Sequence, residues 1–264
     1  MAGRFANLEF NEEREERVEL KATQRLGLRG ESAAPDHLAR AIEEHHWAHY
    51  ETALRYFTRC LEVDRRLIPA WVGQVQMLVA LREYHEAKVW SDKALDLFRG
   101  NPDLLAAKAQ ACIRIHDLRG AYVASDGAMQ GSGSSPWRWQ VRGELLLADG
   151  KRQYDQCFRT ALAEPAADWF DRVIIARILQ FHGRLVAAAE YFKQAVAIEM
   201  GHAQGWLELG QCQAALGISG PARVSISRAL ELKPDLVEAR HALEDCGSTS
   251  ILRGLLRRLG FRGR

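Results

Sequence analysis

Small and apolar residues recur along this chain at a spacing close to 34 residues. A small residue followed by an apolar one stands at six positions, Cys60, Ala94, Ala128, Ala161, Ala195 and Ala229. The steps between them are 34, 34, 33, 34 and 34 residues. Seven positions earlier lies a second column, alanine in five of six cases: Ala53, Ala87, Ala121, Tyr154, Ala188 and Ala222. Self-similarity at a fixed period predicts a repeat architecture, here of six units.

The pattern inside each unit predicts two helices. In the last unit, Trp206, Leu209 and Gly210 begin a first helix at helical spacing, and Gly217 interrupts the pattern as a residue after a helix C-terminus does. A second apolar stripe follows, formed by Ala222, Ile226, Ala229, Leu230 and Leu232. Pro234 ends it, because proline cannot continue a helix interior. The small columns are expected where two helices cross about 8–10 Å apart.

The unit resembles the tetratricopeptide repeat, whose signature is W-x2-L-G-x2-Y…A-x3-F…P. The matching residues of the last unit are Trp206, Leu209, Gly210, Ala222, Ala229 and Pro234. The resemblance covers roughly residues 34–245 and implies an all-α, right-handed solenoid of six repeats. Val237, Ala239 and Leu243 then suggest a C-terminal capping helix. We therefore expect the solenoid to occupy residues 34–246.

The two ends of the chain fall outside the repeats. Residues 1–33 predict a leader with a charged helix, either docked on the first repeat through Phe5 and Phe10 or serving as a short anchor for another protein. Residues 247–264 form a basic amphipathic tail. The residues of this tail proposed to make contacts are Leu252, Arg253, Leu255, Leu256, Arg257, Arg258 and Leu259. Three interpretations of the tail stay open: weak contact of residues 251–264 with an anionic membrane, contact with a partner, or packing on the last repeat or disorder.

Composition excludes several classes of protein. With 36 basic and 34 acidic residues the net charge is +2, which argues against nucleic acid as a partner. The chain holds five cysteines, an odd number that does not suggest a disulfide framework. It has neither an apolar run of about 18 residues nor the apolar core of a secretory signal. We expect a cytoplasmic protein.

Motifs for catalysis and cofactor binding are missing from the sequence. Neither a phosphate-binding glycine loop nor a nucleophile elbow nor a zinc-protease helix motif occurs. His45, His46 and His49 are interpreted as a solvated helix end rather than a metal site, and the cysteines as small buried residues. The carboxylates show no pairing beyond helix-surface spacing. We predict no enzyme activity, no metal and no cofactor.

The first helices of such a solenoid line its concave surface, which is the surface that these proteins use for binding. The repeat frame places one column there: Ile42, Gln76, Gln110, Glu144, Arg177 and Gln211. Arg114, Gln140, Gln180 and Glu208 are predicted beside it. Amides both donate and accept hydrogen bonds, so this ladder suits a peptide segment, although a merely solvated inner face is the alternative. A family variant that clamps a C-terminal carboxylate with Lys and Asn is not expected, since the matching positions are Gln, Ala and Val.

Aromatic residues divide between structural and binding roles. Trp71, Trp139 and Trp206 are predicted at core positions of first helices. Trp137 and Phe170 are predicted at inner-face or edge positions, where they either anchor a ligand or pack in the core.

The function expected from this pattern is a non-catalytic protein–protein interaction scaffold or adaptor that holds a partner segment in the concave groove. Two alternatives are a membrane-surface assembly factor or chaperone tethered by the arginine-rich tail, and a regulatory subunit of an enzyme encoded elsewhere. Self-association also stays open.

Overall fold

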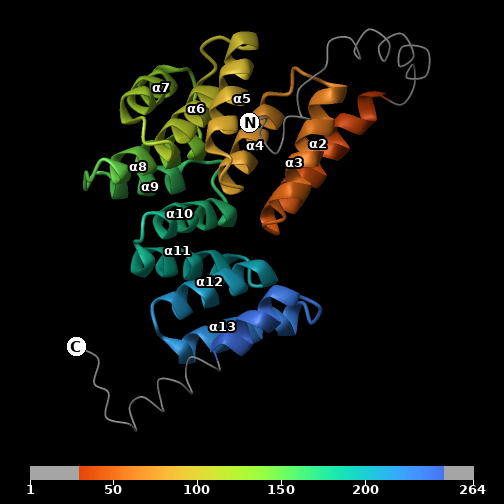
Figure 1. Cartoon of the computed structure of the whole chain (residues 1–264), viewed down its shortest axis with the longest axis vertical. Helices are drawn as coiled ribbons and strands as arrows, with labels where there is room; N and C mark the ends of the chain where they lie inside the picture. Colours follow the sequence, from red (N-terminus) through yellow and green to blue (C-terminus); the bar gives the residue numbers. More distant parts are fainter. Residues whose placement is uncertain (1–29, 247–264) are drawn as a thin grey trace. The chain divides into compact units, whose positions relative to one another are not determined.

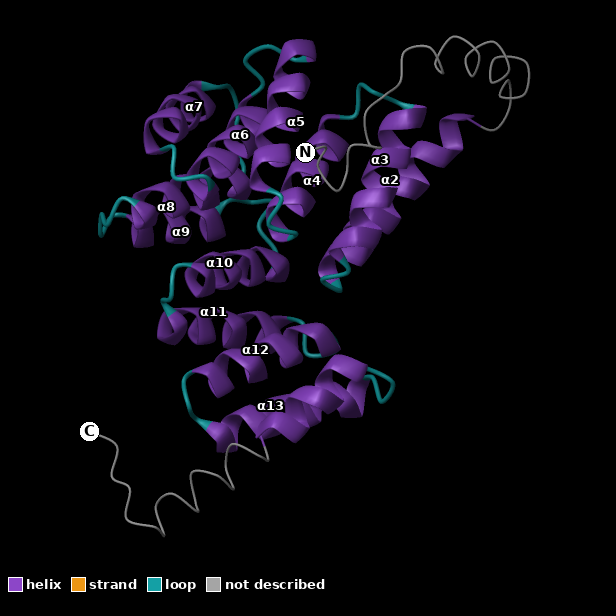
Figure 2. Ribbon diagram, in the orientation of Figure 1, coloured by secondary structure: helices purple, strands orange, loops and turns teal. Residues whose placement is uncertain are grey.

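The computed structural model describes residues 30–246 of the chain. All regular secondary structure in this range is α-helical, as Figure 2 shows. The prediction of an all-α fold is therefore confirmed. Among these residues, none of the helices is long and apolar enough to span a membrane.

The helices follow one another in pairs that match the predicted repeats (Figure 1). The pairs are α2 (Gly30–His46) with α3 (Tyr50–Val63), α4 (Ile68–Ala80) with α5 (Tyr84–Leu97), α6 (Pro102–Arg114) with α7 (Leu118–Gln130), α8 (Pro136–Ala148) with α9 (Tyr154–Ala163), α10 (Trp169–Phe181) with α11 (Leu185–Ile198), and α12 (Ala203–Ala215) with α13 (Ser219–Leu232). A last helix over 237–246 occupies the place of the predicted cap. The first helix begins at residue 30, four residues before the predicted start of the repeats.

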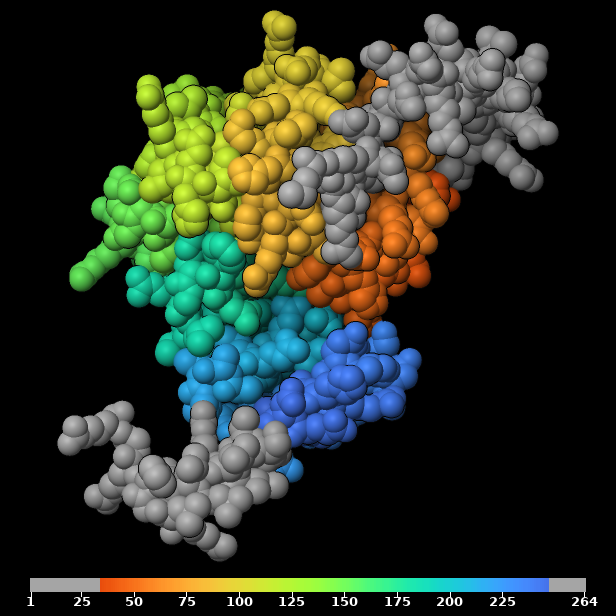
Figure 3. Space-filling model, in the orientation of Figure 1, coloured from red at the N-terminus to blue at the C-terminus, as the bar shows by residue number. Residues whose placement is uncertain are grey.

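The chain divides into two compact units between Tyr154 and Asp155. Unit 1 contains α2 to α8, and unit 2 contains α10 to α13 with the helix over 237–246; α9 begins at the boundary. In the space-filling view of unit 2, the successive helices lie directly against one another (Figure 3).

The small residues of the two columns lie where paired helices touch. Every alanine in both columns is at most 1% exposed. Gly210 shows how tight these contacts are, because a Cβ atom there would stand 2.5 Å from Ile226 Cγ1 and 3.1 Å from the Ala222 carbonyl oxygen. The small residues are thus required by the close approach of α12 and α13.

Each first helix ends in the same turn. The residue after the C-cap has positive φ, between 57° and 78°, in all six repeats: Ala48, Arg82, His116, Gly150, Gly183 and Gly217. At α6, the amide of His116 donates to the Ile113 carbonyl (3.0 Å) and the amide of Asp117 donates to the Cys112 carbonyl (2.9 Å). This pair of bonds defines a Schellman motif, which satisfies carbonyls left without a partner at the helix end. Three repeats adopt this turn without glycine, although a Cβ atom makes the left-handed conformation sterically unfavourable.

The positive φ of this turn predicts opposite changes in stability for two substitutions, one that introduces glycine and one that removes it. His116→Gly should raise the free energy of unfolding by about 1 kcal/mol, because glycine relieves the left-handed strain of an exposed residue. Gly183→Ala should lower it by about the same amount. Urea unfolding of each variant measures both changes. As a control, Arg119→Gly, within the first turn of α7, should destabilise by roughly 0.5–1 kcal/mol. A loss of stability in His116→Gly equal to that of the control would contradict the assignment.

Indole N–H groups tie the turns that precede three first helices. Trp71 Nε1 donates to the Arg65 carbonyl (2.9 Å) and Trp206 Nε1 to the Met200 carbonyl (3.0 Å). Trp139 Nε1 donates to Ser134 Oγ (3.2 Å). Trp71 is buried as predicted, whereas Trp139 and Trp206 are only partly buried. These tryptophans are structural: their indole N–H groups hold the preceding turns by hydrogen bonds, and their apolar rings pack against neighbouring residues.

Candidate functional site

The predicted inner-face residues of unit 1 form a buried polar cluster between α6 and α8. Gln110 Nε2 donates to Glu144 Oε2 (3.0 Å), and Arg114 Nε lies 2.7 Å from Glu144 Oε1. The Glu144 side chain is 0% exposed and that of Arg114 is 9% exposed. A buried carboxylate is stable only when it is paired and hydrogen-bonded, and these two residues supply both contacts. This cluster joins two successive first helices.

Two further glutamines predicted in unit 1 differ in their accessibility. Gln140 is fully buried on α8. Gln76 on α4 is half-buried. Of the six predicted inner-face residues in unit 1, Ile42 on α2 is the most exposed, at 42%. Gln76 presents its side chain to solvent more than the buried Gln110, Gln140 and Glu144 do. A role of these unit 1 residues in binding a partner stays a prediction.

In unit 2 the predicted residues are brought together by a two-bond ion pair. Arg177 on α10 donates from Nε to Glu208 Oε2 (2.9 Å) and from Nη2 to Glu208 Oε1 (2.6 Å). Gln204 Nε2 also donates to Glu208 Oε1 (3.2 Å). The guanidinium carbon of Arg177 lies 5.3 Å from the centre of the Phe170 ring. Parallel guanidinium–carboxylate bonds hold both groups in one geometry, so α10 and α12 are linked as α6 and α8 are.

The other predicted residues of unit 2 face solvent. Gln180 on α10 and Gln211 on α12 are exposed. Beside Gln180, Phe181 is 45% exposed although it is a large aromatic residue, and its ring meets the His182 ring edge-on at 5.0 Å. Sequence reasoning did not single out Phe181. Its signal was present, since it lies four residues after Arg177 and so on the same face of the helix.

Three carboxylates form ion pairs across a repeat boundary that sequence reasoning did not single out. Glu144, Glu208 and Asp103 each pair with an arginine of a neighbouring first helix, at sequence separations of 30, 31 and 35 residues. These separations are close to one repeat. An arginine and a carboxylate about one repeat apart, both on first helices, are therefore the sequence signal that indicates such an ion pair.

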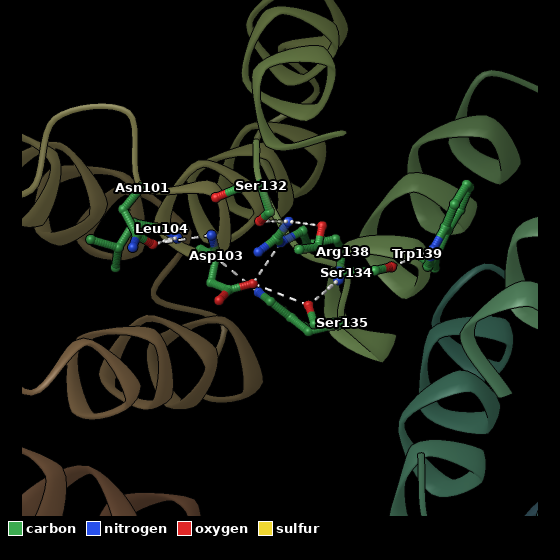
Figure 4. Close-up of polar contacts among 10 residues, drawn as sticks. Asn101, Asp103, Leu104, Ser132, Ser134, Ser135, Arg138 and Trp139 are labelled. Carbon is green, nitrogen blue, oxygen red and sulfur yellow. Dashed lines mark hydrogen bonds and ion pairs between the residues drawn. The ribbon is translucent and has the colours of Figure 1, made fainter. Parts of the chain in front are cut away.

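A third inter-repeat contact holds the connector before α8, which the glycines and serines of residues 130–135 mark as the most flexible-looking loop. Figure 4 shows Asp103 at the start of α6 reaching both Arg138 and Ser135. Arg138 Nε donates to Asp103 Oδ1 (2.9 Å), and its Nη1 donates to the Ser132 (3.1 Å) and Gly133 (2.9 Å) carbonyls. The connector is therefore tied down by the helix that follows it.

Trp137 and Phe170 serve packing in this structure. Trp137 Nε1 donates to the Asp103 carbonyl (3.3 Å) across the repeat boundary. Phe170 is buried in unit 2 beneath the Arg177 guanidinium. These contacts favour the core-packing interpretation of the two residues over that of ligand anchors.

One buried amide stands apart from these networks. Gln74 on α4 is 0% exposed, and neither its Oε1 nor its Nε2 has a hydrogen-bond partner. Sequence reasoning did not select it. The signal was its repeat position, because the equivalent residue of the last repeat is Leu209 of the family signature.

Residues with metal-binding or nucleophilic chemistry are used structurally. Within the described range 30–246, no group of three His, Cys, Asp or Glu residues could hold a metal ion. His49 Nδ1 lies 2.7 Å from Glu44 Oε2. All five cysteines are buried, as predicted, and burial raises the pKa of the Cys60, Cys112 and Cys212 thiols. A raised pKa keeps these thiols protonated and weakly nucleophilic.

The predictions for the leader (1–33) and the tail (247–264) fall wholly or mostly outside the described residues. The tail contacts predicted at residues 251–264 therefore stay predictions. Flotation of the full chain with anionic liposomes, compared with residues 1–246, remains the test of the membrane alternative.

Comparison with solved structures decides the fold. A tetratricopeptide repeat protein from Parabacteroides merdae superposes with a TM-score of 0.50 at 14% identity, over 86% of this chain and 89% of that one. The chain has the tetratricopeptide-repeat fold. A tetratricopeptide protein from Thermus thermophilus gives a TM-score of 0.49 at 14% identity, over 81% and 98% of the two chains. The Cut9 hetero-tetramer structure with Hcn1 gives 0.48 at 15% identity over 88% of this chain, which spans only 46% of that one.

Sequence comparison adds nothing closer, since no family model and no curated protein sequence matches the chain. The tetratricopeptide fold assigns α4, α6, α8, α10 and α12 as first helices of their repeats, in agreement with the repeat frame read from the sequence. The ion pairs Arg114–Glu144, Arg138–Asp103 and Arg177–Glu208 thus join first helices of adjacent tetratricopeptide repeats.

Proposed function

We propose that this protein is a non-catalytic interaction scaffold that binds a segment of a partner protein on the inner face of its first helices. The observation that supports this most strongly is the pair of exposed glutamines, Gln180 and Gln211, beside exposed Phe181 on successive first helices of unit 2. Exposed amides and an aromatic ring offer hydrogen bonds and an apolar anchor on one surface.

The buried polar residues have a different part in this function. The pairs Arg114–Glu144 and Arg177–Glu208 hold neighbouring first helices in register. A rigid arrangement of these helices lowers the entropy lost when a partner segment binds. In unit 2, the ion pair and the exposed residues of the proposed surface thus lie on the same two helices, α10 and α12.

The test is a pull-down from lysate of the native host with two matched double variants. Gln180→Ala with Gln211→Ala removes exposed first-helix amides. Gln130→Ala with Gln194→Ala removes exposed amides of second helices α7 and α11. A partner bound by wild type should be lost from the first variant and kept by the second, with both variants folded by circular dichroism. A partner kept by the first variant would move binding away from this face.

A further inference from the structure

The inner face of unit 2 carries a cation that is already neutralised. Arg177 donates two hydrogen bonds to Glu208, from Nε to Oε2 at 2.9 Å and from Nη2 to Oε1 at 2.6 Å. Its guanidinium also lies over the Phe170 ring. The two side chains are 18% and 11% exposed. An anionic ligand would have to compete with a carboxylate that is already held in the best geometry for a guanidinium. This ion pair therefore disfavours carboxylates and phosphates as ligands of Arg177.

The residues one turn beyond this ion pair are exposed and uncharged. Phe181 lies four residues after Arg177 on α10, and Gln211 lies three residues after Glu208 on α12. Residues three or four apart share a helix face, and the ion pair brings the two faces together. Gln180 is the neighbour of Phe181 on α10, and Ala215 lies four residues after Gln211 on the same face of α12; both are exposed. We call Gln180, Phe181, Gln211 and Ala215 the Phe181 surface.

We infer that the Phe181 surface binds an uncharged peptide segment that places an apolar side chain against Phe181, and that Glu208 sets this specificity by neutralising Arg177. The inference rests on the proposed function and names the ligand class for that site. The amides of Gln180 and Gln211 pair with the ligand backbone, which offers one donor and one acceptor at each residue other than proline. The small side chain of Ala215 leaves room for the ligand's apolar group.

The test uses the full chain and random 12-residue peptides displayed on phage. The selected peptides are then synthesised with amidated C-termini and measured by fluorescence polarisation. We expect sequences without Asp or Glu and with at least one aromatic or large aliphatic residue. Phe181→Ala should weaken binding at least about tenfold, as loss of a buried aromatic anchor does. Val186→Ala is the matched control, because Val186 is 75% exposed at the start of the second helix of the same pair.

A change of charge specificity provides the second part of the test. Glu208→Gln keeps the shape of the side chain but leaves the Arg177 charge unbalanced. Variants of the selected peptide with two Asp residues should then bind about tenfold more tightly than they bind wild type, because a charged hydrogen bond becomes available. The double variant Arg177→Gln with Glu208→Gln should lose that gain. A structural role of the ion pair alone would not reverse the preference in this way.

The outcomes separate the two proposals. Acidic peptides that need Gln180 and Gln211 would overturn the ligand class and keep the proposed function. The same conclusion would follow from binding that needs those glutamines and ignores Phe181→Ala. If no peptide is enriched, or if all selected peptides bind the Gln180 and Gln211 variant as well as wild type, the inner-face function and the inference both fail.

Discussion

Replacing Glu144 with alanine will lower the free energy of unfolding of unit 1 by about 3–5 kcal/mol. The change leaves the nearly buried Arg114 guanidinium without the carboxylate that lies 2.7 Å away, and it removes the acceptor of Gln110 Nε2. An uncompensated charge in a low-dielectric site is among the few single changes with so large an effect. Hydrogen exchange of α6 and α8, followed by mass spectrometry, measures the loss within the full chain.

Two controls show whether burial is the cause. The double variant Arg114→Met with Glu144→Met removes both charges and should be close to neutral, because similar apolar volume replaces the pair. Glu43→Ala breaks an ion pair with Arg40 whose side chains are 55% and 51% exposed, so solvent screening should keep its effect far below that of Glu144→Ala. Equal losses in Glu144→Ala and Glu43→Ala would contradict the role assigned to the buried cluster.

Gln74→Met should stabilise unit 1 by about 1–3 kcal/mol. The side chain is fully buried and both polar atoms of its amide lack partners, so folding removes their bonds to water without replacement. Methionine has nearly the same length and shape and carries no such penalty. Denaturant unfolding, with hydrogen exchange of α4 to locate the change, measures the gain.

A matched control for this prediction exists in unit 2. Gln213 is also a buried glutamine of a first helix, but its Oε1 accepts from Ser225 Oγ at 2.8 Å. Gln213→Met should therefore destabilise the protein, because it leaves the buried Ser225 hydroxyl without that acceptor. If both methionine variants lose stability by similar amounts, the unpartnered amide of Gln74 does not destabilise the folded protein as we infer.

The sequence predicts the helix pairs because their determinants are local and periodic. The alanine columns and Gly210 recur at one spacing since every pair of helices crosses at the same place and needs small residues there. Glycine marks the left-handed turn at Gly150, Gly183 and Gly217, whereas three other repeats adopt the same conformation without glycine, at Ala48, Arg82 and His116. Glycine indicates such a turn in a sequence, so the turn is not predicted where the fold places a residue other than glycine in the left-handed conformation.

The candidate site is less accessible to sequence reasoning, because its character depends on neighbours in space. Gln110, Glu144 and Gln211 occupy one column of the repeat frame, yet the first two are buried in a polar cluster and the third is exposed. The column predicts which helix face a residue occupies. Whether the residue meets an arginine of the next repeat is decided by the packing of whole helices. For the same reason the pairing of Arg177 with Glu208 was missed.

Binding of a partner segment to the inner face of the first helices is tested most directly by mapping a bound partner on the full chain. Photo-crosslinking in the native host, with p-benzoylphenylalanine at position 211 or at position 224, compares exposed sites on α12 and on second helix α13. We predict a discrete crosslinked partner from position 211 and none from position 224. A partner crosslinked from position 224 alone would contradict the inner-face account.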